Sequence, residues 1–402
     1  MARPRSSSSR QSRISPIPTP PGCQPRPVRH LLPGLAGLVV LGLAGLVVPA
    51  GQAGEISATG GGLSLGTRVN GQLGGSCTGG VCAIGGGTAA GSNLFHRFSS
   101  FDTRGGIRSV LFDTQGQRHL VVGVVNPLGS FLDKPIQFSS PASLTWLSPG
   151  GIHLGGGGGF INIPSLRLST ATGLRVGGGL FDALGTTAAQ AAQLSGTPIA
   201  GRAGLVSDPA SLAAASLSAN GDVSVSGGLI TVDHELLLDA QGGHVLLQGA
   251  QIQAPAISVS GRSIVQNGGS LEASSASGAG GTVSLQAGSI QHGGAIHADG
   301  ASGGGTVAVQ ATSQLTATGE VSARGLGATA KGGTIELTAP SVSLQGATAD
   351  ASGAGGGGAV RIGGGYQGSA LSQGGGNAAT TSLDAASTLR ADATGQIGRA
   401  HV

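Results

Sequence analysis

A glycine pair followed by an alternating apolar segment recurs through the C-terminal half of the sequence, and this repeat constrains the fold more than any other feature. The pairs begin at positions 242, 280, 304, 332 and 357, and segments such as Val-Ser-Leu at 283–285 follow them. A second series, Leu-Glu-Ala at 271, Ile-His-Ala at 296 and Val-Ser-Ala at 321, recurs every 25 residues. A fixed period in the twenties with alternation of apolar and polar residues predicts a parallel β-helix, one coil per repeat. At the corners, glycine is expected because it adopts positive φ freely.

The composition favours many thin layers of aliphatic residues over one large core. Of the 402 residues, 79 are glycine, whereas 2% are aromatic and 9% are charged. Because 39% of the residues are hydrophobic and charge is scarce, intrinsic disorder is disfavoured. Collagen is excluded since glycine does not recur at every third position. The density of glycine and β-branched residues excludes helical solenoids, so the predicted class is an all-β solenoid.

The first 53 residues predict a signal peptide. Residues 1–30 hold six arginines and no acid, and an apolar stretch follows from 31 to 48. Small residues precede two candidate cleavage sites, after Ala50 and after Ala53, and we favour the second. An uncleaved membrane anchor is the alternative, since 18 apolar residues reach the lower limit for a span. Without the six arginines the formal net charge of +4 becomes −2, which leaves no basic footprint for nucleic acid.

Two cysteines remain beyond the signal peptide, and their spacing predicts a disulfide. Cys77 and Cys82 enclose the sequence Thr-Gly-Gly-Val, which suits a small closed turn. A metal site would need two further ligands, and no nearby His, Asp or Glu supplies them. A disulfide implies an oxidising compartment, and neither a metal nor a cofactor is expected.

Aromatic residues concentrate between residues 93 and 181, where nine of the ten in the chain lie. Aromatic side chains bury large areas, so we expect a denser core there than further along the chain. Short apolar runs in this region are separated by Gly, Pro, Asn and Asp, which is typical of strands and turns. The Ala-rich stretch from 186 to 219 predicts a short helix near 188–194, an insertion or a loop.

No arrangement of polar residues predicts catalysis. The glycine-rich runs lack the Gly-Lys-Ser/Thr of a phosphate-binding loop and the strand-to-helix context of a dinucleotide site. His292 and His297 are interpreted as solvent-exposed repeat positions, and Asp-His-Glu at 233–235 as a turn. Three aspartates are expected to be solvated turn residues without a basic partner: Asp102, Asp113 and Asp133. We therefore expect the chain not to be an enzyme.

Two short blocks stand behind the predicted signal peptide and ahead of the repeat. The first is Asn-Leu-Phe-His-Arg-Phe-Ser-Ser-Phe at 93–101, and the second is Ser-Pro-Gly-Gly-Ile at 148–152. This arrangement resembles the N-terminal secretion domain of two-partner secretion exoproteins, the filamentous-haemagglutinin-like adhesins. The family's blocks read Asn-Leu-Phe-His-x-Phe-x-x-Phe and Asn-Pro-Asn-Gly-Ile. Ser148 and Gly150 replace the two asparagines of the second block, and Arg97 replaces a commonly small polar residue. Pro149 followed by glycine still favours a tight turn.

The resemblance implies a right-handed parallel β-helix, capped at its N-terminus by extra β-strands. It also implies Sec-dependent export and then passage through a dedicated outer-membrane β-barrel transporter, whose periplasmic domains bind the secretion domain in extended form. Edge-strand pairing would provide such recognition through backbone hydrogen bonds. The resemblance assigns transporter recognition to these residues: Asn93, Leu94, Phe95, His96, Phe98, Phe101, Ser148, Pro149, Gly150, Gly151 and Ile152.

The resemblance further implies a secreted or cell-surface adhesin of a Gram-negative cell, whose partner would be a cell-surface or glycan receptor. Two alternatives stay open: a secreted β-helical enzyme that acts on polysaccharide, and a surface matrix component without a specific receptor. The predicted divisions are a signal peptide over 1–53, a secretion domain over 54–240, a β-helix shaft over 241–394 and an irregular tail over 395–402. That tail is expected to mark the truncation of a longer protein.

Overall fold

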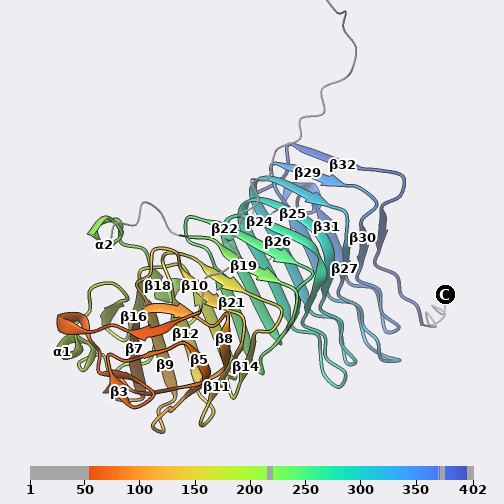
Figure 1. The fold of residues 1–402 in the computed structure, drawn as a ribbon. Coiled ribbons are helices and arrows are strands. Elements are labelled where there is room, and N and C mark those ends of the chain that lie inside the picture. Colours follow the sequence, from red (N-terminus) through yellow and green to blue (C-terminus); the bar gives the residue numbers. More distant parts are fainter. Residues whose placement is uncertain (1–53, 215–220, 370, 372–375, 396–402) are drawn as a thin grey trace, which may run out of the picture. The chain divides into compact units, whose positions relative to one another are not determined.

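The structure, a computed structural model, describes residues 54–214, 221–369, 371 and 376–395, and these form a parallel β-helix of about 11 turns (Figure 1). The predicted fold class is thereby confirmed. The predicted signal peptide and residues 396–402 of the predicted tail lie outside the described residues. Among the described residues, no helix is long and apolar enough to cross a membrane.

Each coil contributes strands to three parallel sheets, here called face 1, face 2 and face 3. Face 1 contains β7 (Asn93–Asp102), β9 (His119–Val124), β12 (Ser143–Leu147), β15 (Ser165–Ser169), β21 (Glu235–Asp239), the first parts of β24 (Ala256–Glu272), β25 (Thr282–His297) and β26 (Thr306–Ala317), then β28 (Thr334–Thr338) and β31 (Ala359–Ile362).

Faces 2 and 3 repeat the same stacking with other segments of each coil. Face 2 contains β10 (Ser130–Leu132), β13 (Ile152–Leu154), β19 (Val223–Ser226), β22 (His244–Gln248), later parts of β24 to β26, β29 (Ser341–Leu344) and β32 (Thr380–Leu383). Face 3 contains β5 (Gly79–Gly86), β8 (Gly106–Phe112), β11 (Pro135–Phe138), β14 (Gly159–Ile161), β20 (Leu229–Thr231), β23 (Gln251–Gln253), the ends of β24 and β25, β27 (Glu320–Ser322), β30 (Thr348–Asp350) and β33 (Thr388–Arg390). Between β31 and β32 lies the short η3 (Tyr366–Gly368).

The interior is built from ladders in which each residue is the register partner of one residue in the next coil. One ladder on face 1 is Leu94, Leu120, Leu144, Leu166, Leu236, Ile257, Val283, Val307 and Ile335. All of these side chains are buried. Burial of an aliphatic side chain of this size stabilises the fold by roughly 1.5–3 kcal/mol. The alternation seen in the sequence thus places every second residue inside the coil.

The glycine pairs serve the stacking of coils, and the predicted reason for them was wrong. Among the pairs at 280, 304, 332 and 357, no residue has a positive φ. Instead, a Cβ added at Gly305 would lie 2.1 Å from the Gly281 carbonyl oxygen, and one at Gly333 would lie 2.0 Å from that of Gly305. Any side chain there would push neighbouring coils apart. Glycine is required because backbones of successive coils approach too closely for a Cβ.

Antiparallel strands cover the first coil, as predicted for the N-terminal cap. β1 (Ile56–Ala58) pairs with β4 (Ser76–Cys77) and with β7, and η1 (Gly61–Leu63) follows β1. β6 (Thr88–Ala90) pairs with the beginning of β7. β2 (Thr67–Val69) and β3 (Gln72–Leu73) form a hairpin that extends face 3 beyond β5. The free edge of the first coil is thus paired, which protects it from pairing with another chain.

An insertion between β15 and β19 packs on the outer side of face 1. It contains β16 (Gly173–Val176), β17 (Gly179–Asp182), α1 (Ala188–Ala191), η2 (Arg202–Gly204), β18 (Leu205–Val206) and α2 (Pro209–Ala214), and its three strands form a small antiparallel sheet. The short helix predicted near 188–194 is confirmed by α1. A second apolar cluster joins the insertion to the outer side of face 1, with Phe181 and Leu174 packed in the same cluster as Phe95 and Val121.

Candidate functional site

The first sequence block forms most of β7, and alternation divides its side chains between two environments. Leu94 and Phe98 point into the coil and belong to the main core. Phe95 points outward and belongs to the cluster beneath the insertion. Because β-strand side chains alternate with a period of two, His96 shares the interior side, and Asn93 and Arg97 share the outer side. All six residues are fully buried.

Aromatic rings of the first block fill the interior of the first coils. The rings of Phe98 and Phe101 meet edge to face with centroids 4.9 Å apart, and Phe101 meets Trp146 in the same way at 4.5 Å. Phe112 and Phe138 from face 3 extend this cluster, with centroids 5.7 Å apart. Edge-to-face pairs of this kind contribute about 0.5–1.5 kcal/mol beyond the burial of their area. These aromatic residues thus form a buried cluster in the region where the sequence concentrates them.

The outer side of β7 holds the insertion. The Asn93 side-chain Nδ2 donates to the carbonyl oxygens of Leu194 and Gly196, each at 2.7 Å. The ring of Phe95 stacks on Phe181 with centroids 5.0 Å apart. The first block therefore connects the core of the first coils to a segment that lies about a hundred residues later in the chain.

Arg97 is a buried cation that is satisfied by backbone carbonyl groups. Its Nε donates to Ala183 O at 2.6 Å, one Nη to Leu63 O at 2.8 Å and the other to Asp182 O at 2.9 Å. Burial lowers the pKa of Arg97 to about 10, and the carboxylate of Asp182 opposes that shift. Arg97 thus stays charged at neutral pH and joins the insertion to η1, which ends at Leu63.

Replacing Arg97 with Met should loosen the insertion. The three carbonyl oxygens would lose their donor in a buried site, at a cost of about 3 kcal/mol. Limited proteolysis should then cut between 177 and 205 faster than in the parent chain. Arg175→Met is the matched control, because Arg175 is exposed on β16 of the same insertion. Equal cleavage rates in the two variants would contradict the role given to Arg97.

His96 occupies an interior position that carries an apolar side chain in the coils that follow. It is the register partner of Val122, and Trp146 follows in the next coil. Its Nδ1 lies 3.3 Å from Thr67 Oγ1, whereas Nε2 has no hydrogen-bond partner among the described residues. Burial lowers the pKa of His96 to about 4, against the opposing field of Asp113. The imidazole is therefore neutral at physiological pH.

The second block forms the predicted tight turn. The Gly151 N–H donates to Ser148 O at 2.9 Å, which confirms the turn. A Cβ at Gly150 would lie 2.4 Å from Asn126 O, and Gly151 has a φ of 124°, so both positions require glycine. Ile152 after the turn is buried in the interior of face 2.

The two blocks meet around Ser130 of β10. Trp146 Nε1 donates to Ser130 Oγ at 3.0 Å, and Ser130 Oγ donates to Ser148 Oγ at 2.9 Å. Ser130 is also the register partner of Phe101 and of Ile152. Of the eleven residues assigned to transporter recognition, all but the half-buried Gly150 are buried in the folded chain.

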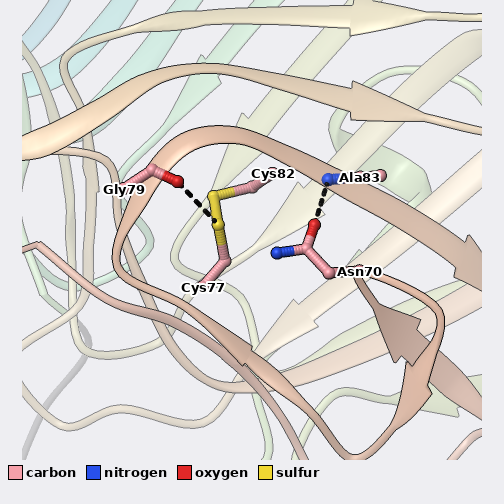
Figure 2. Close-up of a disulfide and its surroundings, with 5 residues drawn as sticks. All are labelled: Asn70, Cys77, Gly79, Cys82 and Ala83. Carbon is pink, nitrogen blue, oxygen red and sulfur yellow. Dashed lines mark hydrogen bonds between the residues drawn. A yellow bond between two sulfur atoms is a disulfide. The ribbon is translucent and has the colours of Figure 1, made fainter.

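Cys77 and Cys82 are joined by a disulfide, which Figure 2 shows beside Asn70 and Ala83. Both cysteines are buried in the main core, Cys77 on β4 of the cap and Cys82 on β5 of face 3. The Ala83 N–H donates to Asn70 Oδ1 at 2.9 Å, which ties the hairpin of β2 and β3 to β5. The Cys77 sulfur lies 3.5 Å from Gly79 O; because it carries no hydrogen, this is a contact and not a hydrogen bond.

A row of charged residues lies on face 3, and the sequence did not lead us to predict it. His297 Nδ1 lies 3.0 Å from Glu272 Oε2, and its Nε2 lies 3.8 Å from Glu320 Oε1. The hydrogen bond to Glu272 raises the pKa of His297. In the following turn, Arg324 Nη2 lies 2.7 Å from Asp299 Oδ2. The recurrence every 25 residues places 272 and 297 in register and could have revealed this row.

Three other interpretations of polar residues need correction. His292 is buried rather than solvent-exposed, and its Nδ1 lies 2.9 Å from Gln266 Oε1. Asp102 has a basic partner, because Arg104 Nη2 lies 2.6 Å from its Oδ2. Lys134 Nζ lies 3.3 Å from Asp133 Oδ2. Near neighbours in the sequence thus neutralise two of the three aspartates.

No protein-family model matches the sequence, and no curated protein matches it. Among solved structures, the chain is similar to the crystal structure of the HMW1 secretion domain from Haemophilus influenzae. The two are 17% identical, with a TM-score of 0.49, over 85% of this chain and 84% of that chain. A likeness this distant does not indicate a shared function.

Proposed function

We propose that this chain is a secreted, adhesin-like exoprotein of a two-partner secretion system. The observation that carries the proposal is the pairing of the two sequence blocks around Ser130, through Phe101, Trp146 and Ser148. The two blocks that resemble the family's secretion domain thus contact each other in the first coils. Because this contact is buried after folding, a transporter would bind the blocks before the coils fold.

The export step is tested by secretion into the medium. The full chain, with its own signal peptide, is expressed in a Gram-negative host with and without the cognate outer-membrane transporter. We expect the protein in the medium only when the transporter is present. Retention in the periplasm in both strains would overturn the secretion proposal. The chain would then resemble the family in its fold alone.

Substitutions in the first block should reduce export to the level seen without the transporter. Asn93→Asp replaces the Nδ2 donor by a carboxylate beside the Leu194 and Gly196 carbonyl oxygens, and Phe95→Asp buries a charge. Synthesis, measured in whole cells, should stay unchanged. Leu73→Asp is the control, because Leu73 is exposed in the cap hairpin. Normal amounts of Asn93→Asp and Phe95→Asp protein in the medium would count against recognition through this block.

We further propose an adhesive role without catalysis. The carboxylates of the face 3 row are consistent with this, because Glu272 and Glu320 lie beside His297 and Asp299 is paired with Arg324, so none of the three is an unpaired carboxylate. Adhesion of cells that is lost on deletion of the gene and blocked by soluble glycans would support a specific receptor. Adhesion that glycans do not affect would favour the surface matrix alternative.

A further inference from the structure

A groove lies at the corner where face 1 turns into face 2, and we call it the corner groove. Its volume is about 490 Å³. Its lining includes the small residues Gly261, Ala287 and Ala311, which are register partners in three consecutive coils. None of them carries more than a methyl group, and Ala287 and Ala311 belong to the main core.

Amide and hydroxyl side chains line the corner groove beside these small residues. Gln286 and Gln310 are register partners in adjacent coils and repeat with the coil spacing of about 4.8 Å. Gln286 is exposed, and its side chain makes no hydrogen bond to another described residue. Asn377 also lines the groove, and its Nδ2 donates to Gly368 O at 2.9 Å. Thr312 adds a hydroxyl group.

The described lining of the corner groove contains no carboxylate and a single cation. That cation, Arg202, lies with its Nε 3.5 Å from Oδ1 of the fully buried Asp239. The carboxylate of Asp239 offsets the positive charge of the guanidinium. A charged ligand would therefore find no unbalanced partner charge in this groove, whereas a hydroxylated, uncharged ligand would find amide donors and acceptors.

The neighbouring part of face 2 is uncharged too. Its strand segments at 263–267, 289–292, 314–317, 341–344 and 380–383 contain no Asp, Glu, Lys or Arg. Their exposed positions carry Ser, Thr, Gln and Asn, of which Gln291 is one example, and one leucine, Leu383. The charged row of Glu272 and His297, in contrast, lies on face 3. Apart from the exposed Arg262, which lies between Gly261 and the segment at 263–267, the uncharged surface continues from the corner groove across one face of the shaft.

We propose that the corner groove binds a linear, uncharged polysaccharide chain, an inference that rests on the adhesive function proposed above and adds a ligand class and a site. Amide groups donate to and accept from sugar hydroxyl groups, and Gln286 and Gln310 place two of them in adjacent coils, between Ser260 and Thr338 at the same register position. A linear ligand with repeated hydroxyl groups matches this recurrence better than a compact one. Such a ligand gains its affinity from several neighbouring contacts, since no aromatic side chain is among the described lining residues.

The test is equilibrium binding of the purified full chain to fluorescently labelled oligosaccharides. The probes are cellohexaose, laminarihexaose and maltohexaose, with an oligogalacturonate of the same length as the acidic comparison. We expect at least one uncharged probe to bind and the acidic probe to bind less. Binding of the oligogalacturonate alone, or of no probe, would overturn the proposal. Because secretion plays no part in this measurement, its failure is distinguishable from failure of the secretion proposal.

Variants locate the binding in the groove. Gln286→Ala should weaken binding about tenfold, as expected for loss of one or two hydrogen bonds to the ligand. Gln291→Ala is the matched control on the same strand, outside the groove, and should leave the affinity unchanged. Thr312→Trp should block the groove without disturbing the interior, since Thr312 is exposed. Equal effects of Gln286→Ala and Gln291→Ala, or normal binding by Thr312→Trp, would overturn the assignment.

Discussion

Replacing Val307 with Asp should lower the free energy of unfolding by several kcal/mol. The Val307 side chain is fully buried in the face 1 ladder, between its register partners Val283 and Ile335. A carboxylate at this position would lose its hydration without gaining a partner, because both neighbours along the ladder are aliphatic. Even if the group takes up a proton, a polar hydroxyl would remain in an apolar layer.

The measurement is the urea concentration at the midpoint of unfolding, followed by circular dichroism. Thr316→Asp is the matched control, since Thr316 lies on the same strand, β26, at an outward-facing position of face 2. We expect a large fall in the midpoint for Val307→Asp and a small change for Thr316→Asp. Equal midpoints in the two variants would mean that the inward assignment of this ladder is wrong.

Acid should weaken the fold through two buried histidines. Burial lowers the pKa of His96 and of His292 to about 4 in the folded chain, from an ordinary value of 6.5. Asp113 opposes the shift at His96. At His292 the carbonyl group of Glu320 opposes it, and His297 adds to it. Between pH 6.5 and about 4 the unfolded chain binds these protons and the folded chain does not. Stability is therefore fully present above pH 6.5 and falls toward pH 4, by roughly 3 kcal/mol for each histidine.

Unfolding midpoints measured from pH 7 to pH 4 check this expectation. His292→Gln should flatten the dependence on pH, because it removes one of the two titrating groups. His244→Gln is the control, since His244 is exposed at the start of β22. A stability that stays constant over this range would contradict the assignment of two neutral, buried imidazoles.

The coils were predictable from sequence because residues one repeat apart in the sequence are register partners in neighbouring coils. Residues 25 apart, such as Leu271 and Ile296, become register partners without any other information. The reason for the glycine pairs was missed because φ is a local property, whereas the limit at Gly305 comes from the carbonyl group of another coil. His292 was misjudged because a polar residue type usually indicates solvent, and here Gln266 satisfies it inside the coil.

The candidate site was predictable only as a string of residues. Nothing in the first block reveals that Asn93 and Arg97 hold a segment near residues 182–196, because that contact spans about a hundred residues. The strand that this block forms is buried on both of its sides over residues 93–98. The alternation of apolar and polar residues indicates which side of a strand faces the interior of the coil. It does not indicate that a later segment, here the insertion, packs on the other side.

The repeated register also determines how a protein of this kind can change in length over evolution. Each coil in the shaft contacts only the coils before and after it, as the pairings of β25 with β24 and β26 show. Duplication of one whole repeat of 25 residues would therefore extend the shaft by about 4.8 Å and leave every ladder in phase. Insertion of one residue within a strand would instead turn polar positions toward the interior. The length of the shaft can thus change by whole coils. The inward-facing residues of each coil are constrained by their register partners in the neighbouring coils.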